Sequence, residues 1–183
     1  MAHTFDPEMA DRLEDPSRYR YCSRDELLSL LDPDSGDLVA DVGSGTGFYT
    51  RDVAPAAARV LGIDLQPAMH ALFRERGLPK NVALVSADAE ALPLADACLD
   101  GAVATMTFHE IATEGALAEL ARVLAPGGRF AVVDWSAEGE NEAGPPMDGR
   151  QSAASAASML ETAGFSIDHA RERPETFALV ARR

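Results

Sequence analysis

The chain has 183 residues, of which 46% are hydrophobic and 25% charged, with two cysteines, Cys22 and Cys98. A domain of this size buries roughly 70% of the surface that its unfolded chain exposes, so the composition excludes both a chain disordered throughout and a mini-protein held together by disulfides. No apolar run approaches the ~20 residues that cross a bilayer, and the cysteines show no metal-ligand spacing, so we expect neither a membrane span nor a metal site.

The charge balance is strongly acidic. Thirty acidic residues oppose sixteen basic ones, which gives a net charge of −14, and Lys80 is the single lysine. An acidic surface with arginine in place of lysine suits a cytoplasm at molar salt, where the screening length falls to about 3 Å. We therefore expect a halophilic source, although an acidic protein from a GC-rich genome would show the same composition. The acidity also argues against nucleic-acid partners, since no basic cluster is present to replace counterions.

The N-terminal residues 1–22 show little apolar periodicity and are predicted to form a frayed tail or a lid. The stretch Met1–Asp15 is acidic and lacks the basic flank and apolar run of a secretory signal, which favours a cytoplasmic location. Residues 23–183 are predicted to form a single domain, because no repeat, low-complexity block or composition shift divides them. This domain opens with the capping-box spacing of Ser23-Arg24-Asp25-Glu26, which predicts a short helix through Leu31.

Five short β-branched or aliphatic runs follow, separated mostly by stretches with helical punctuation. One predicted helix spans Pro67–Gly77, and another begins after Thr113 and ends at Pro126-Gly127-Gly128. Apolar runs of strand length that alternate with helices indicate parallel strands buried on both faces. The predicted strands are Leu38–Val42, Arg59–Ile63, Asn81–Val85, Leu99–Thr105 and Arg129–Asp134.

The C-terminal part has a different spacing. The apolar runs Phe165–Ala170 and Thr176–Ala181 are only a few residues apart, which is too short for a parallel crossover, so we expect an antiparallel pair. The predicted architecture is an open α/β sheet, mostly parallel, with this hairpin at one edge. The longest polar loop spans residues 136–149, and loops of that length are usually either functional or disordered. Arg150 follows this loop directly. It is predicted to lie on the surface rather than to bind an acidic substrate.

The strongest chemical signal is Asp41–Phe48, which follows the first strand and leads into a predicted helix. Its glycines allow a sharp turn and close approach to a ligand, and the helix start presents N–H groups and a positive dipole end. No lysine follows the glycines, which excludes a P-loop, and Phe48 stands where a dinucleotide fingerprint requires a small residue. Asp64 ends the second strand 21 residues beyond Gly43, where an acid accepts hydrogen bonds from ribose hydroxyls. A nucleoside with a small carboxylate and no phosphate fits better than a dinucleotide.

Four motifs then occur in order. Gly43-x-Gly45-x-Gly47 follows the first strand, Asp64 ends the second, Asp88 ends the third, and Arg122–Gly128 precedes the fifth. Together they resemble the class I S-adenosylmethionine-dependent methyltransferases, in particular the small-molecule branch called methyltransferase type 11, over roughly residues 20–182. The resemblance implies a Rossmann-like open sheet of seven strands, mostly parallel, with an antiparallel C-terminal hairpin and helices on both faces. The motif Val133-Asp134-Trp135 resembles an uncharacterised subgroup.

The resemblance implies S-adenosylmethionine as cofactor and gives roles to matching residues. Asp41 would orient the methionine amino group, the glycine loop would line the methionine and ribose, and Asp64 would hold the ribose. Leu65 would pack on the adenine, and Asp88 with the Ala89 backbone would read the adenine edge. Met106 would approach the sulfonium. The implied cofactor-binding residues are Asp41, Gly43, Ser44, Gly45, Thr46, Gly47, Asp64, Leu65, Asp88, Ala89 and Met106.

On the acceptor side the resemblance implies Phe108 and His109 near the methyl acceptor, with Asp134 and Trp135 facing its pocket. His109 is the candidate catalytic residue, a general base, although a lone histidine after a strand more often closes a local hydrogen-bond network. A base is required only where the acceptor is protonated, as in an alcohol or phenol.

The implied activity is transfer of a methyl group by in-line displacement to a small-molecule acceptor, in which positioning alone supplies ~7–11 kcal/mol of barrier reduction. We expect this acceptor to be the main partner of a monomer or homodimer, with no nucleic acid and no membrane. Two alternatives stay open: a non-catalytic S-adenosylmethionine-binding module, and a methyltransferase that acts on tRNA or protein. An NAD-dependent reductase is disfavoured by Phe48.

Overall fold

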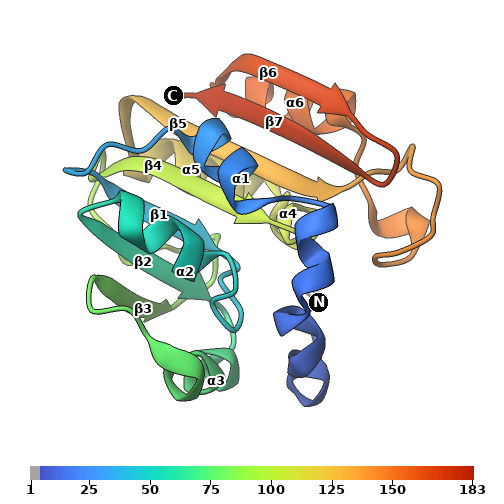
Figure 1. Cartoon of the computed structure of the whole chain (residues 1–183). Coiled ribbons are helices and arrows are strands. Elements are labelled where there is room, and N and C mark those ends of the chain that lie inside the picture. Colours follow the sequence, from blue (N-terminus) through green and yellow to red (C-terminus); the bar gives the residue numbers. More distant parts are fainter. Residues whose placement is uncertain (1–4) are drawn as a thin grey trace.

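The computed structural model describes residues 5–183 and centres on a seven-stranded sheet in the order β3-β2-β1-β4-β5-β7-β6 (Figure 1). Strands β1 to β5 pair in parallel, whereas β7 is antiparallel to both β5 and β6. The predicted open α/β sheet with an antiparallel C-terminal hairpin is thereby confirmed. The strands are β1 Leu38–Val42, β2 Arg59–Asp64, β3 Val82–Ser86, β4 Leu99–Thr105, β5 Leu124–Trp135, β6 Ser166–Glu172 and β7 Thr176–Arg182.

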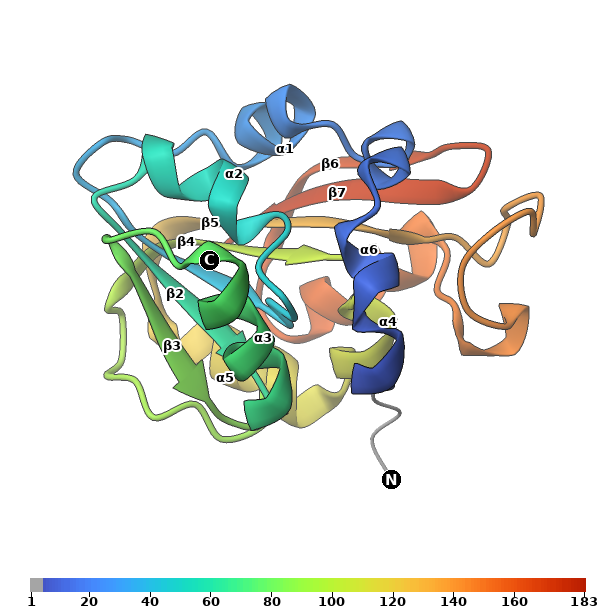
Figure 2. The ribbon, with the colours of Figure 1, turned by 60° about the horizontal axis from the view of Figure 1, so that its bottom comes forward.

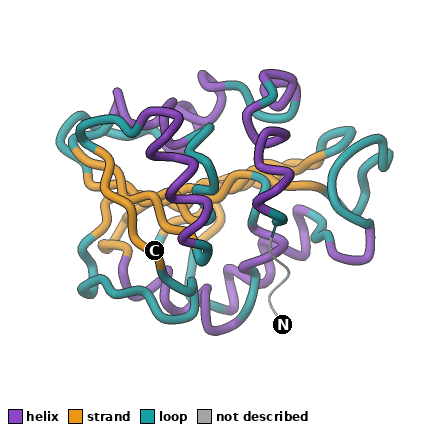
Figure 3. Tube along the Cα trace, turned by 90° about the horizontal axis from the view of Figure 1, so that it is seen from below, coloured by secondary structure: helices purple, strands orange, loops and turns teal. Residues whose placement is uncertain are grey.

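Helices cover both faces of the sheet, as Figure 3 shows with the sheet seen nearly edge-on. Apolar side chains of α1, α2 and α3 pack on one face, and those of α4, α5 and α6 pack on the other, which gives two cores. Figure 2 shows α1 and α2 on one side and α5 on the opposite side. The helices are α1 Arg24–Leu31, α2 Thr50–Val53, α3 Pro67–Gly77, α4 Phe108–Ile111, α5 Glu114–Val123 and α6 Ala153–Thr162, with 3-10 helices η1 Pro7–Glu14, η2 Pro16–Arg20, η3 Ala54–Ala56 and η4 Met147–Gly149. Within residues 5–183, no helix combines the length and apolarity that a membrane crossing requires.

Helix α5 ends three residues earlier than predicted, at Val123, and strand β5 already begins at Leu124. The Pro126-Gly127-Gly128 motif therefore lies inside β5, where the pairing with β4 shifts register. Gly127 has φ +81°, a conformation that glycine adopts without steric cost, and its amide donates to Arg183 O at 2.9 Å. The motif that was predicted to end a helix instead forms a bulge in a strand.

The helix predicted after the glycine loop is much shorter than expected. Helix α2 has four residues and passes into η3, which contains Pro55. Proline has no N–H group and clashes with the carbonyl four residues earlier, so the helix does not continue through this position. An element this short has little macrodipole, so its start contributes little to the binding of an anion.

The N-terminal segment, residues 5–22, lies beyond the carboxyl ends of β1, β2 and β4 (Figure 1). Glu14 accepts a hydrogen bond from Thr46 Oγ1 at 2.5 Å and forms an ion pair with Arg51. Arg76 on α3 forms an ion pair with Asp11. These contacts show a docked segment rather than a frayed tail over the described residues, and residues 1–4 lie outside them. Whether the segment moves as a lid stays a prediction.

Candidate active site

Two glycines shape the loop after β1. Gly43 has φ +76°, and a Cβ at this position would lie 2.3 Å from Thr107 Oγ1. Gly47 has φ +85°, and a Cβ there would lie 2.2 Å from the ring of Phe73. Both the conformation and the space exclude any side chain at these two positions, so the loop can bend tightly over the ends of β1 and β4.

A cavity of about 610 Å³ opens beyond this loop, at the carboxyl ends of β1, β2 and β4. This is the place where an open α/β sheet binds ligands, because the strand order reverses between β1 and β4. Most of the predicted site residues line it, namely Asp41, Gly43, Ser44, Gly45, Thr46, Asp64, Leu65, Asp88, Ala89, Met106 and His109. Gly47 does not line the cavity but supports the turn from beneath.

Asp41 is a buried carboxylate on the floor of the cavity, with 2% of its surface exposed. Thr50 Oγ1 donates a hydrogen bond to its Oδ2 at 2.5 Å. Burial raises the pKa of Asp41 to about 6; the Thr50 bond opposes this rise and the negative charge of Asp64 adds to it. The group is therefore a strong acceptor that lacks a cationic partner of its own.

Asp64 ties the glycine loop to the chain after β2. Its Oδ2 accepts from the Gly45 amide and its Oδ1 from the Gln66 amide, both at 2.8 Å. Each carboxylate oxygen has two lone pairs, so Asp64 retains acceptor capacity toward the cavity that it lines. Asp88 is exposed and accepts from the Glu90 amide at 3.0 Å, which is the turn-capping arrangement that acids at strand ends often adopt.

Two hydroxyl groups in the cavity wall have no hydrogen-bond partner. Ser44 Oγ and Thr105 Oγ1 are buried, and neither donates to or accepts from another described residue. A buried hydroxyl without a partner costs about 1–3 kcal/mol, so such groups are rare unless a ligand or water completes them. Together with the acids of the cavity, they suit a nucleoside ligand rich in hydroxyl and amino groups.

His109 lines the cavity, and its imidazole forms a hydrogen bond with Asp134. Its Nδ1 lies 2.9 Å from Asp134 Oδ2, and its backbone amide donates to the same oxygen at 2.6 Å. Burial lowers the pKa of His109, but the hydrogen bond and charge of Asp134, with a contribution from Glu110, outweigh it and leave the pKa raised. Nε2 remains on the side of Glu110, 3.9 Å from its Oε1.

The other predicted acceptor residues do not line the cavity. Asp134 is fully buried, and its oxygens are occupied by His109 and by the Trp135 amide, so it acts through the histidine. Phe108 is also fully buried and packs in the core against the rings of Phe130 and Phe177. We therefore leave Phe108 out of the acceptor site.

Trp135 packs within the loop that follows β5, at residues 136–150. Its ring contacts Tyr21 at 4.7 Å, and Gly144 passes so close that a Cβ would lie 2.5 Å from the indole. The Arg150 guanidinium lies 5.8 Å from the same ring. Arg150 is 5% exposed, so its predicted surface position is wrong. Its guanidinium donates to the carbonyls of the loop, with Nε 2.9 Å from Pro145 O.

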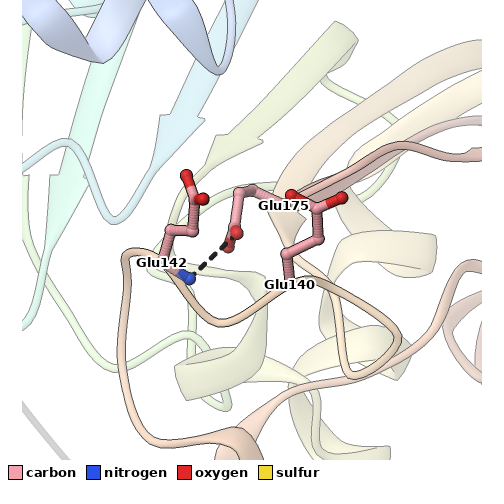
Figure 4. Close-up of side chains that lie close together, drawn as sticks. All are labelled: Glu140, Glu142 and Glu175. Atoms are coloured by element: carbon pink, nitrogen blue, oxygen red, sulfur yellow. Dashed lines mark hydrogen bonds between the residues drawn. The ribbon is translucent and has the colours of Figure 1, made fainter.

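The carboxylates of Glu140, Glu142 and Glu175 lie close together (Figure 4). Their oxygens lie within 4.8 Å of one another, which is a spacing that a cation site requires. Glu175, the buried member, already has partners: the Glu142 amide donates to it at 2.9 Å, and Arg150 Nη1 lies 3.8 Å away. The nearby guanidinium of buried Arg150 thus explains how the carboxylate of Glu175 can be buried.

Sequence reasoning allowed an N-terminal lid but named no residue of this segment as part of the cavity. Phe5, Leu13 and Arg18 line it, although they are distant in sequence from the glycine loop. Their segment has no apolar periodicity and consists of 3-10 turns, so neither helix nor strand patterns reveal it. The arginines of the domain that bind the segment gave no local signal either.

Fold and site together define an α/β protein that holds a nucleoside-type ligand at the strand ends. A family model described as "Methyltransferase domain" matches residues 40–132. A crystal structure of a SAM-dependent methyltransferase from Aquifex aeolicus superposes with a TM-score of 0.86 and 32% identity, covering 97% of this chain and 98% of that one. The chain belongs to the methyltransferase-domain family, and S-adenosylmethionine is its cofactor.

Two relatives are enzymes with named acceptors. Demethylmenaquinone methyltransferase of Corynebacterium kroppenstedtii is 37% identical over 107 residues, which are 58% of this chain and 45% of that protein. Malonyl-[acyl-carrier protein] O-methyltransferase of Pectobacterium atrosepticum is 34% identical over 133 residues, 70% of this chain and 52% of that protein. The chain spans about half the length of the curated relatives that it matches.

Proposed function

We propose that this methyltransferase transfers a methyl group by in-line displacement to a small-molecule acceptor, with His109 as the general base. The observation that carries the proposal is the position of His109 on the wall of a cavity of about 610 Å³. Cavities of roughly 300–1,000 Å³ take small molecules, and this one has to hold both the cofactor and the acceptor. Little volume remains for a large acceptor.

The cofactor fits the cavity in the orientation that its donors and acceptors favour. The acidic Asp41 suits the methionine ammonium group, and Asp64 suits the ribose hydroxyls. Leu65, 45% exposed at the cavity edge, offers an apolar surface for the adenine. The glycine loop, with Ser44 and Thr46, also lines the cavity and is proposed to contact the methionine and ribose, and Asp88 with Ala89 is proposed to contact the adenine edge. Met106, with φ +58° after β4, lies on the side of His109.

Bound S-adenosylmethionine supplies an electrophilic methyl group with a good leaving group. The hydrogen bond to Asp134 requires the neutral imidazole to carry its proton on Nδ1, which leaves Nε2 free to accept one. Nε2 would take the proton that the acceptor hydroxyl loses, and Asp134 would stabilise the resulting imidazolium, while S-adenosylhomocysteine would leave with the electrons of the broken sulfur–methyl bond. Solvent then removes the proton.

The acceptor class follows from this arrangement. A positioned base helps only an acceptor that must lose a proton, so we propose a hydroxyl-bearing small molecule. The two relatives described above act, by their names, on demethylmenaquinone and on malonyl-[acyl-carrier protein], so their acceptors differ from each other. The net charge of −14 argues against tRNA as the substrate.

The test is a methyl-transfer screen with radiolabelled cofactor. Extracts of small metabolites, total tRNA and total protein are offered separately to the purified chain. We expect label in the metabolite fraction only. Transfer solely to tRNA or to protein would overturn the substrate class, and cofactor binding without transfer to any fraction would favour a non-catalytic binding module.

We also propose a halophilic source, on the basis of the acidic, arginine-rich composition. At molar salt, screening mutes the repulsion among surface carboxylates, so the fold should gain stability. Thermal unfolding in low KCl and in molar KCl measures this directly. An unfolding temperature that does not change with salt would refute the proposal.

A further inference from the structure

We infer that Arg18 is an anchor for the carboxylate at the amino-acid end of the cofactor. Arg18 belongs to η2 in the docked N-terminal segment and lines the cavity. This inference deepens the proposed function, because it rests on the proposed orientation of the cofactor. It does not depend on which acceptor the enzyme uses.

The guanidinium of Arg18 has hydrogen-bond donors available for a ligand. Its Nε is buried and has no hydrogen-bond partner among residues 5–183, and no carboxylate of that part of the chain lies within ion-pair distance. Other arginines of the same region, such as Arg51 and Arg76, are paired with acids. A buried guanidinium nitrogen without a partner is costly, so a ligand that completes it is favoured.

The side chain is held in place by aromatic contacts rather than by charge. The guanidinium carbon lies 5.3 Å from the ring centroid of Phe48 and 5.2 Å from that of Tyr49. The Tyr49 hydroxyl donates to Arg18 O at 3.2 Å, which fixes the backbone as well. These contacts orient the planar fork without occupying its donors, an arrangement that suits two-point binding of a carboxylate.

The glycine loop cannot serve this carboxylate well. The amides of Gly43 and Ser44 both donate to Ile63 O, at 2.8 and 2.9 Å, and the Gly45 amide donates to Asp64. The Gly47 amide donates to Ser44 O at 2.9 Å. With these four amides occupied, few donors of the loop remain for the carboxylate, which favours a donor from elsewhere in the cavity.

The charges around the cavity point to the same group. Five acids line it, whereas Arg18 is the single arginine or lysine among the described lining residues; the acids are Asp41, Asp64, Asp88, Glu90 and Glu110. Arg18 and Asp41 act on each other electrostatically across the cavity. An acid and a guanidinium facing one space match the ammonium and carboxylate of an amino acid.

The test compares two ligands that share the nucleoside and differ in the amino-acid end. S-adenosylhomocysteine carries the aminocarboxylate, and 5′-methylthioadenosine lacks it. Calorimetric titration of both is carried out on wild type, on Arg18→Met and on Arg12→Met. Methionine keeps an apolar stem over Phe48 and Tyr49. Arg12 is exposed on the same segment and does not line the cavity, so it controls for the loss of one charge.

We expect Arg18→Met to weaken S-adenosylhomocysteine binding by about 10- to 100-fold, the value of a hydrogen-bonded charged pair, and to leave 5′-methylthioadenosine binding within about twofold. Arg12→Met should leave both unchanged. Equal losses for both ligands would show a structural role for Arg18 and overturn the inference. Unchanged binding of both, with a raised KM for an acidic acceptor, would assign the arginine to the acceptor and also overturn it. Failure of wild type to bind either ligand would instead count against the proposed cofactor orientation.

Discussion

Two loops at the carboxyl edge of the sheet each lie next to a buried charged group, and the two groups differ in their hydrogen bonds. The glycine loop after β1 borders Asp41, which has a single hydrogen-bond donor, Thr50, and faces the cavity. The loop after β5 wraps Arg150, whose Nη2 donates to Ala143 O at 2.5 Å and to Pro145 O at 2.7 Å. The carboxylate of Asp41 has one hydrogen-bond partner, whereas the guanidinium of Arg150 has several.

This difference separates a loop built for a ligand from a loop built to hold its own shape. Unsatisfied polar groups cost about 1–3 kcal/mol each, so the unpaired hydroxyls of Ser44 and Thr105 are tolerable where a ligand or water completes them. The guanidinium of Arg150 instead donates hydrogen bonds to the carbonyls of its own loop. The length and polarity of a loop do not distinguish these two cases, whereas the hydrogen bonds of its buried polar groups do.

Asp134, near the end of β5, binds His109 of the cavity wall, and its substitution should have the largest effect. Asn in place of Asp134 removes the charge that orients His109 and stabilises the imidazolium, so we expect kcat/KM to fall by about 10²- to 10⁴-fold. The wild-type rate should rise with pH through the raised pKa of His109, because the neutral imidazole is the base. In Asp134→Asn this limb should move to lower pH. Burial lowers the pKa of His109, and the negative charge of Asp134 that opposes this lowering is then absent.

Rate profiles against pH for wild type, Asp134→Asn and His169→Gln measure this prediction. His169 is exposed on β6 and should have no effect. Stability provides a second readout: the raised pKa stabilises the wild-type fold at pH values below about 6.5, and this contribution is lost as pH rises through the folded-state pKa of His109. A pH limb that stays in place in Asp134→Asn would contradict the proposed pairing.

The loop after β5 should respond in stability rather than in binding. Arg150→Met leaves Glu175 buried without its cation and several loop carbonyls without donors, so we expect a loss of about 3–5 kcal/mol in the free energy of unfolding. S-adenosylhomocysteine affinity should change little, because Arg150 does not line the cavity. Urea unfolding and calorimetry measure the two effects. A large loss of affinity in a variant that remains folded would show that this loop also serves the ligand.

Asp41 should show the opposite balance. Its pKa of about 6 exceeds the ordinary value of 3.8, so the folded state binds the proton more tightly than the unfolded state. Its contribution to stability is full below pH 3.8 and is lost as pH rises through 6, which amounts to about 3 kcal/mol. Asp41→Asn should therefore be more stable than wild type at pH 7.5 by up to this amount, and nearly equal at pH 4.

Urea unfolding at both pH values tests the Asp41 prediction, with the exposed Asp148→Asn as control. Cofactor affinity should fall in Asp41→Asn, because the neutral amide attracts the methionine ammonium less strongly. A variant that is less stable than wild type at pH 7.5 would show that burial does not penalise this carboxylate.

The sheet and the ligand loop could be predicted from sequence because their signals are local. Alternating apolar runs specify buried parallel strands, and Gly43 and Gly47 occupy positions where no side chain fits. The Pro126-Gly127-Gly128 motif misled the prediction, because the same residues that end helices also form bulges in strands. Local patterns identify a break in structure, but the neighbouring strand decides its form.

The surroundings of the site could not be predicted because they depend on contacts between distant segments. Arg150 has a polar sequence neighbourhood that is typical of a surface, yet the loop folds around it. Arg18 reaches the cavity from a segment without periodicity. Asp134 seemed to face the acceptor, since it ends a strand at the right edge, but its oxygens are used by His109 and by the Trp135 amide.

Asp64 offers the finest test of how far the glycine loop depends on its own hydrogen bonds. Asp64→Ala removes the acceptor for the Gly45 amide as well as the proposed ribose acceptor, so we expect cofactor affinity to fall by about 1.5–3 kcal/mol and stability by about 1 kcal/mol. Asp64→Asn keeps one acceptor oxygen, which can serve either the Gly45 or the Gln66 amide, so its loss of stability should be smaller than that of Asp64→Ala while its affinity still falls. Comparing these losses separates ribose binding from support of the loop. If Asp64→Asn bound S-adenosylhomocysteine as tightly as wild type, the carboxylate would serve the loop alone and the ribose would have to be held by other groups.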